Sequence, residues 1–105
     1  GMKVVDTVYT YGYSEDEVRH LAKRLKYNVK KLKLYIVCLP ILGDGLMEIY
    51  DYKQFQQSFY KQIKKDIVVL GFARDKAGAQ EIVLSLTQDL YDSDCNFDIK
   101  KFFGI

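Results

Sequence analysis

Cysteine and histidine are scarce in this chain of 105 residues, which contains two cysteines and one histidine. Cys38 lies within an apolar run and is typical of a small core residue, whereas Cys95 lies in a polar stretch. Two unmatched cysteines without an export signal favour a reducing compartment, so we expect a cytoplasmic protein. His20 has no second ligand at metal-binding spacing and no Cys-x-x-Cys occurs, so neither a metal nor another cofactor is predicted.

Long apolar runs are also absent. The longest are residues 34–39 and 67–70, whereas a membrane-spanning helix needs about 20 apolar residues, so no membrane partner is expected. Residues 3–13 are polar and interrupted, which does not fit a signal peptide. We interpret Gly1 as a residue left by removal of a tag. The remaining length, 2–105, is typical of a single domain.

The motifs of common catalytic sites are missing as well. There is no Gly-x-Ser-x-Gly nucleophile elbow. The acid pair Glu15 and Glu17 fits a helix start, and Asp92 and Asp94 lie in a polar loop. Glu48 interrupts an apolar stretch, and a solvated position on an edge strand is its simplest interpretation. General acid–base catalysis needs a carboxylate held in a pocket, which no pattern indicates here, so we predict that the protein is not an enzyme.

A helix-start pattern is present twice. The Ser14 side chain can accept from the amide of Glu17 while Glu17 reaches back to the amide of Ser14, which is a capping box. Asp51 and Gln54 repeat the arrangement. The first predicted helix runs from Ser14 to near Lys31. Its apolar side chains follow a helical period: Val18, Leu21, Ala22, Leu25, Val29 and Leu32.

Strands are predicted from short apolar or β-branched stretches. Residues 64–66 break the second helix before the last of these stretches. A third helix should follow, with Asp75 as its N-cap and an end near Tyr91. The predicted strands are residues 3–9, 34–39, 46–50 and 67–72.

The order of these elements predicts an α+β fold. Strand–helix–strand–strand–helix–strand is the ferredoxin-like βαββαβ order, with a four-stranded antiparallel sheet and both crossover helices on one face. The extra C-terminal helix would then cover an edge, the open face or a partner. If residues 3–9 stay outside the sheet, the alternative is a three-stranded sheet with three helices.

Positive charge is concentrated in the first predicted helix. Through Lys65 the chain has twelve basic and seven acidic residues, whereas from Asp66 onward it has four and seven. A basic ridge can hold the phosphates of a nucleic acid or an acidic protein surface. The helix dipole also favours cations toward a helix end, and a net charge of +2 is small for a nucleic-acid binder. The ridge consists of Arg19, Lys23, Arg24, Lys26, Lys30 and Lys31.

A strand-to-helix turn at residues 71–78 (GFARDKAG) is a second candidate site. The first amides of a helix can bind an anion, and Arg74 and Lys76 would add positive charge there. The glycine spacings of dinucleotide-binding and P-loop motifs are absent. A turn in which Asp75 caps the helix is therefore the simpler alternative.

Aromatic residues give two further expectations. Tyr9, Tyr11 and Tyr13 alternate and could stack bases, but the aromatic–glycine signature of the RRM strand is absent. Tyrosines in a core or a dimer contact are the favoured alternative. Residues 97–105 form an aromatic tail that can fold back on the core or dock on another chain, so we expect a homodimer.

Two functions remain open after this survey. The leading interpretation is a small non-catalytic interaction or regulatory module that self-associates through the open sheet face or the tail. The alternative is a protein that binds a nucleic acid or an acidic partner through the basic ridge. No motif in the chain decides between them.

Overall fold

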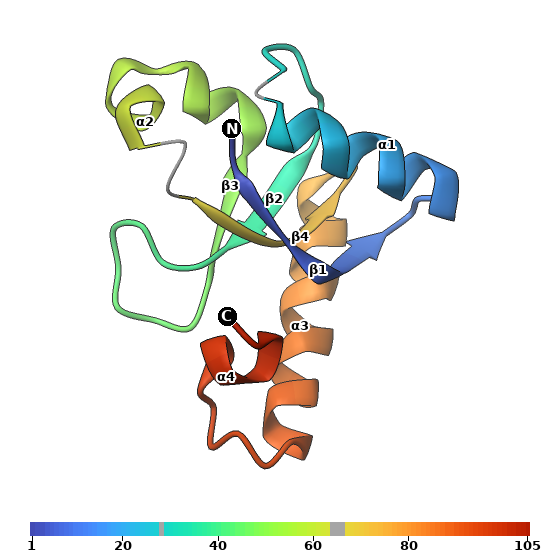
Figure 1. The fold of residues 1–105 in the computed structure, drawn as a ribbon, viewed down its shortest axis with the longest axis vertical. Coiled ribbons are helices and arrows are strands. Elements are labelled where there is room, and N and C mark those ends of the chain that lie inside the picture. The colour runs from blue at the N-terminus through green and yellow to red at the C-terminus, as the bar shows by residue number, and fades with distance from the viewer. Residues whose placement is uncertain (28, 64–66) are drawn as a thin grey trace.

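The computed structural model describes residues 1–27, 29–63 and 67–105, and it shows an α+β fold with a four-stranded mixed sheet (Figure 1). The break predicted at residues 64–66 lies outside the described residues. Along the chain the elements are β1 (Lys3–Tyr11), α1 (Glu15–Lys26), β2 (Tyr35–Cys38), β3 (Glu48–Asp51), the 3-10 helix η1 (Tyr52–Gln56), α2 (Ser58–Ile63), β4 (Val68–Ala73), α3 (Lys76–Asp92) and α4 (Ile99–Phe103).

The strands lie in the order β1-β4-β2-β3. β1 runs parallel to β4, with Lys3 opposite Val68 and Tyr11 opposite Ala73, and β2 runs antiparallel to both of its neighbours. The first strand therefore belongs to the sheet, and the alternative of a three-stranded sheet is wrong. The ferredoxin-like topology is not confirmed, because the parallel β1–β4 pair replaces the all-antiparallel sheet that it requires.

The end of α1 explains where the chain departs from the predicted path. The helix stops more than one turn before the predicted end near Lys31. The carbonyl of Val29 accepts from the Tyr52 hydroxyl at 2.5 Å, and the carbonyl of Lys30 accepts from the side chain of Gln56 at 3.2 Å. These carbonyls are satisfied by η1, so a further helical turn is not needed to pair them.

The segment at residues 29–34 then leads into β2 outside any helix or strand. Leu32 and Leu34 are buried in the core below α1 and η1. The Leu34 carbonyl accepts from the amide of Tyr52 at 3.0 Å, directly before β2 pairs with β3. This segment gives the chain the length to reverse, so that β2 runs antiparallel to β1, whereas a βαβ crossover would have made the two strands parallel.

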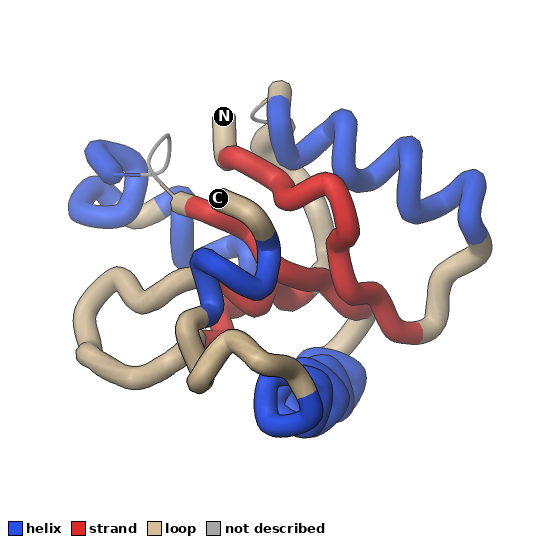
Figure 2. The backbone as a smooth tube through the Cα atoms, turned by 60° about the horizontal axis from the view of Figure 1, so that its bottom comes forward, coloured by secondary structure: helices blue, strands red, loops and turns tan. Residues whose placement is uncertain are grey.

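Helices cover both faces of the sheet, as Figure 2 shows with α1 and α3 on opposite sides of the strands. In β2, Ile36 and Cys38 belong to the core on the α1 side, and Val37 belongs to the core on the α3 side. All three side chains are fully buried. The extra C-terminal helix therefore covers the face that the predicted topology left open.

The aromatic tail is packed against its own chain. Asp98 caps α4 by accepting from the amide of Lys101 at 3.1 Å, and Gly104 ends the helix at φ 71°. Ile99 is buried, and Phe103 meets the Tyr9 ring edge to face with ring centroids 6.1 Å apart. Ile99, Phe102 and Phe103 thus extend the α3-side core, whereas Phe97 and Ile105 stay exposed.

The remaining helices follow the predicted starts closely. Asp51 and Gln54 form a capping box, but they open η1, and Gln57 in extended conformation separates η1 from α2. The single second helix that the sequence predicted is therefore two short ones. Asp75 caps α3 by accepting from the amide of Gly78 at 2.8 Å, as predicted.

Candidate functional site

The basic ridge begins on α1, whose start is fixed by the predicted capping box. The Glu17 amide donates to the Ser14 hydroxyl at 3.2 Å, and the Ser14 amide donates to the Glu17 carboxylate at 3.0 Å. With this start, Leu25 is fully buried against the sheet. The basic residues of the helix consequently lie on its outer side. Arg19, Lys23 and Lys26 are exposed, and Arg24 is half-buried.

Lys30 and Lys31 lie beyond α1, so the ridge is not a single helix face as predicted. Both side chains are exposed, as is Lys33 in the same segment. The hydrogen bonds that hold this segment come from η1, through Tyr52 and Gln56. The ridge is therefore carried by two neighbouring parts of the structure instead of one.

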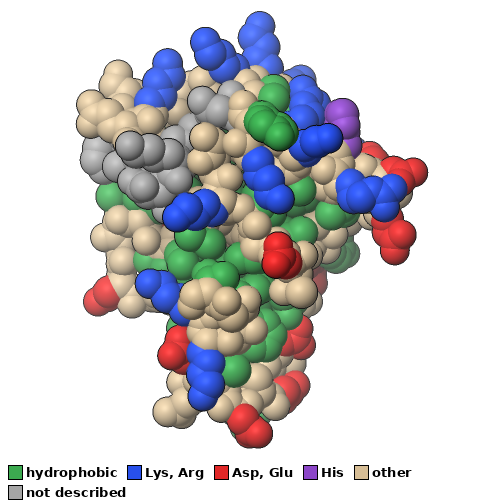
Figure 3. Space-filling view, in the orientation of Figure 1, with side chains coloured by type: hydrophobic (Ala, Val, Ile, Leu, Met, Phe, Trp, Pro, Cys, Tyr) green, Lys and Arg blue, Asp and Glu red, His purple; other side chains and the backbone are tan. Residues whose placement is uncertain are grey.

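Two further exposed lysines come from the helices beside this segment, Lys53 on η1 and Lys61 on α2. Figure 3 shows Lys and Arg side chains gathered over the end of the molecule where α1 and α2 lie. Sequence reasoning did not connect these two lysines with α1, because only the fold brings η1 beside residues 29–34. We define the basic surface as Lys23, Lys26, Lys30, Lys31, Lys33, Lys53 and Lys61.

Few of these charges are neutralised. Within the described residues, Lys53 is the member of the basic surface that has a carboxylate partner, Asp51 at 3.6 Å. Arg19 pairs with Asp16 on its own helix, outside the basic surface. Exposed pairs of this kind contribute little and are screened by salt. The remaining lysines leave a positive field on this end of the protein.

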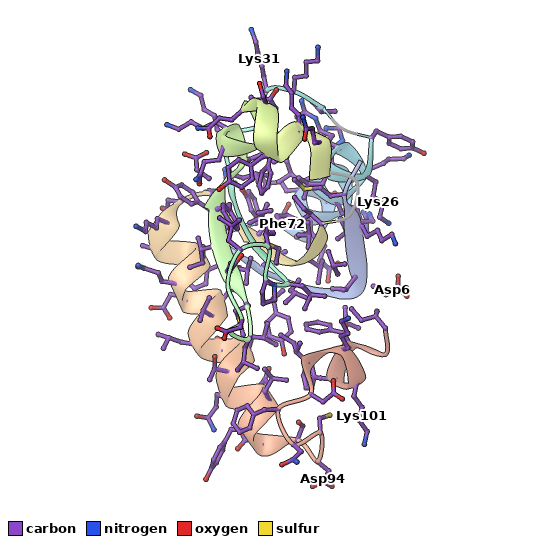
Figure 4. The ribbon with its side chains drawn as sticks, turned by 90° about the vertical axis from the view of Figure 1, so that its left-hand side faces the viewer. Asp6, Lys26, Lys31, Phe72, Asp94 and Lys101 are labelled. Carbon is purple, nitrogen blue, oxygen red and sulfur yellow. The ribbon has the colours of Figure 1, made fainter. Side chains whose placement is uncertain are left out.

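Exposed acidic residues lie at the opposite end, together with two exposed lysines of α4, Lys100 and Lys101. Asp89, Asp92, Asp94 and Asp98 are all exposed on α3 and in the turn before α4. Figure 4 places Lys31 and Asp94 at opposite ends of the molecule, whose longest dimension is 37 Å. The charge asymmetry along the chain is therefore also a separation in space, and the small net charge does not reflect it.

Arg74, predicted for an anion-binding turn, is bonded within the protein. Its Nε donates to the Gly12 carbonyl at 2.9 Å, and its Nη2 donates to the Glu17 carboxylate at 2.6 Å. The guanidinium also lies over the Tyr13 ring, 4.6 Å from its centroid. Hydrogen bonds from the Ser14 amide and from Arg74 lower the pKa of the Glu17 carboxyl. Lys76 is exposed beside this cluster.

The position of Arg74 is the one where α/β sheets often bind ligands. The parallel strands β1 and β4 end side by side, and the chain continues to α1 on one face and to α3 on the other. Such a point commonly opens a crevice. In this protein Arg74 spans it, and Asp75 occupies the first amides of α3. The arrangement fits a structural link between layers better than an anion site.

Glu48 is not a solvated side chain of an edge strand, as the sequence suggested. Its carboxylate accepts from the amides of Ile41 at 2.6 Å and Gly43 at 2.7 Å, and from the Tyr50 hydroxyl at 2.9 Å. Burial acts to raise the pKa of Glu48, but these hydrogen bonds outweigh it and the pKa lies below its ordinary value. Glu48 thus holds the loop between β2 and β3. The sequence offered one sign of this role: an acidic residue between apolar neighbours, directly after a glycine-containing loop whose amides it could bind.

Two adjoining hollows of about 530 and 290 Å³ lie beside α4 and the start of β4. Both are lined by Leu39, Val68 and Lys100, and neither is lined by Glu48 or Arg74. Among the described residues that line them, neither hollow pairs a carboxylate with another ionisable group.

Within residues 1–27, 29–63 and 67–105, no group of three or more histidine, cysteine, aspartate or glutamate side chains is placed to hold a metal ion. No helix in those ranges is both long and apolar enough to cross a membrane.

No family model, curated protein or solved structure gives a significant match to this chain.

The tyrosines that were candidates for base stacking lie mostly in packed positions. The Tyr9 hydroxyl donates to Asp89 of α3 at 2.5 Å, and Tyr13 packs against Phe72 with ring centroids 5.7 Å apart. Tyr11 is 54% exposed, but it lies at the end of β1, away from the basic surface. The alternating tyrosines therefore do not form a stacking platform.

Proposed function

We propose that this protein is a non-catalytic binding module whose basic surface holds the phosphate groups of a nucleic acid. The observation that carries this proposal is the gathering of lysines from α1, residues 30–33, η1 and α2 at one end of the molecule. Within the described residues, most of these lysines have no carboxylate partner. Unpaired lysines on one surface release counterions when they bind phosphates, which is the main source of such affinity.

The helix dipole alone does not account for this surface. It favours cations in the last turn of α1, such as Lys23 and Lys26. The same preference covers Lys53 and Lys61, which lie in the last turns of η1 and α2. It gives no reason for Lys30, Lys31 and Lys33, which lie outside any helix. Solvation of a single helix face is therefore an incomplete explanation, and a shared ligand for these elements is the more economical one.

The composition of the surface favours phosphates over an acidic protein. Protein–protein interfaces are depleted of lysine and have an apolar centre. Most of the large exposed apolar side chains lie on other elements, for example Leu42 in the β2–β3 loop, Leu84 on α3 and Ile105 at the chain end. A surface that offers mainly lysines is better suited to a phosphate backbone.

Self-association was predicted through the open sheet face or the tail. α3 and α4 cover the sheet face, and Ile99, Phe102 and Phe103 of the tail pack against their own chain, whereas Phe97 and Ile105 stay exposed. The homodimer remains a prediction that a measurement of mass in solution would test. The cytoplasm remains the proposed compartment, and the unbonded Cys38 and Cys95 support it.

Charge reversal with a matched control tests the proposed function. The triple variant Lys23→Glu, Lys26→Glu, Lys30→Glu should lose retention on heparin and on immobilised RNA. The control variant Lys76→Glu, Lys100→Glu, Lys101→Glu changes the net charge equally but lies outside the basic surface, and it should keep most of the retention. Far-UV circular dichroism checks that both variants fold. Equal losses in the two variants would mean that net charge alone is responsible and would reject the basic surface as the site.

A further inference from the structure

Tyr27 is an exposed aromatic side chain beside the lysines of the basic surface in the sequence. It caps the C-terminus of α1 and is 73% exposed. Its amide donates to the Lys23 carbonyl at 3.0 Å, so the backbone is held while the ring lies in solvent. Sequence reasoning missed it, because it lies in the middle of the helix that was predicted to continue to near Lys31.

The Tyr27 ring has no partner among the described residues. Neither a ring contact nor a side-chain hydrogen bond holds it. Tyr91 is similarly exposed, at 71%, but it contacts Phe97 with ring centroids 6.3 Å apart. A single exposed apolar side chain is ordinary on a protein surface, so exposure by itself does not indicate function.

The neighbours of Tyr27 are what distinguish it. Lys23 precedes it by four residues on α1, so the two side chains lie on the same side of the helix. Lys26 is the preceding residue, and the exposed Lys30 and Lys31 follow within one turn's length of chain. An exposed ring is therefore flanked in the sequence by exposed lysines, on a surface that otherwise offers mainly charge.

We propose that the basic surface binds single-stranded nucleic acid, with one base stacked on the Tyr27 ring and the neighbouring phosphates held by the lysines. This ligand class rests on the phosphate-binding function proposed above. Proteins that bind single strands without sequence preference combine a cationic track with aromatic rings on which bases stack. In a duplex the faces of the bases are already stacked on each other, so the Tyr27 ring would have nothing to contact there. Single strands should consequently bind more tightly than duplexes of the same charge.

The test compares a labelled oligothymidylate of about 12 nucleotides with a duplex of similar length by fluorescence anisotropy. Tyr27→Leu should weaken binding of the single strand by roughly fivefold or more and leave binding of the duplex unchanged. Tyr27→Phe keeps a ring and should retain the affinity. Tyr91→Leu removes an equally exposed tyrosine at the acidic end and should have no effect.

The outcomes separate this inference from the proposed function. If Tyr27→Leu binds the single strand as tightly as the unchanged protein, or loses both ligands equally, stacking is rejected. The lysine variants can still show in that case that the surface binds phosphates. If the unchanged protein binds neither ligand, the proposed function itself fails. If polyglutamate displaces the oligonucleotide at lower concentration than unlabelled oligothymidylate does, the partner is an acidic protein and the inference is overturned.

Discussion

Arg74 connects three parts of the molecule through one side chain. It bonds the Gly12 carbonyl between β1 and α1 and the Glu17 carboxylate on α1, and it lies over the Tyr13 ring. Its partners are 62 and 57 residues away in the sequence. No local pattern around residues 71–78 could show that this guanidinium is already engaged, which is why the sequence offered Arg74 as an anion ligand.

Replacement of Arg74 by lysine should therefore destabilise the protein although it keeps the charge. Lysine lacks the planar fork that bonds two partners and stacks on a ring. We expect Arg74→Lys to lower the free energy of unfolding by about 1 kcal/mol, since the ion pair is partly exposed and contributes modestly. Urea denaturation measures the loss. Arg19→Lys is the control, because Arg19 pairs only within α1 and should change stability little. Equal effects at the two positions would contradict the linking role of Arg74.

Glu48 predicts a pH dependence of stability. Burial acts to raise its pKa, but the amides of Ile41 and Gly43 outweigh burial and bring the pKa below its ordinary value of 4.5. A carboxyl whose pKa is lowered by folding stabilises the protein above its unfolded pKa, and this stabilisation is lost as the pH falls through the folded-state pKa. The free energy of unfolding should therefore decrease between about pH 5 and pH 3.

The variant Glu48→Gln isolates this contribution. It should be less stable than the unchanged protein by about 1 to 2 kcal/mol at neutral pH, because the loop amides lose a charged acceptor. The difference in stability should shrink in acid, because protonation makes the Glu48 side chain of the unchanged protein neutral, like glutamine. Glu17 also has a lowered pKa, but it is present in both proteins and cancels from the comparison. A stability difference that does not vary with pH would rule out the carboxylate of Glu48 as its source.

At the scale of the elements, helix starts could be predicted from neighbouring residues, whereas contacts between distant segments could not. The capping boxes at Ser14 and Asp51 and the cap at Asp75 located three helix starts correctly. The end of α1 could not be located, because the carbonyls of Val29 and Lys30 are bonded by η1 and not by neighbours in sequence. The path of the chain after α1 sets the direction of β2, and β4 runs antiparallel to β2. The parallel pairing of β1 with β4 was therefore not predicted either.

The close pairing of β1 with β4 leaves no room for a side chain at Gly71. A Cβ added there would lie 2.8 Å from the Tyr9 carbonyl oxygen and 3.0 Å from a methyl of Ile82. The first of these is backbone of the paired strand and cannot move without disturbing the sheet.

Gly71→Ala should therefore lower the free energy of unfolding by about 1 to 3 kcal/mol, as overpacking usually does. The matched control is Gly45→Ala, where an added Cβ meets nothing within 4 Å and stability should hardly change. Chemical denaturation measures both. A neutral Gly71→Ala would argue against close pairing of β1 with β4.

At the scale of the whole molecule, charge is divided between two ends. The sequence showed the excess of cations before residue 66 and the exposed run on α1, but not their junction with Lys53 and Lys61. That junction depends on η1 lying beside residues 29–34, a contact made through Tyr52 and Gln56. It also explains how a protein with a net charge of +2 can present a strongly positive surface to a ligand.

The salt dependence of binding tests the central claim most directly. The dissociation constant for an oligothymidylate would be measured from about 50 to 200 mM salt. If four to five phosphates are held, the logarithm of the association constant should fall against the logarithm of the salt concentration with a slope of about −3. The variant Lys23→Glu, Lys26→Glu, Lys30→Glu should show no measurable binding across this range. Binding that does not change with salt, or that survives the three charge reversals, would contradict a phosphate-binding function for the basic surface.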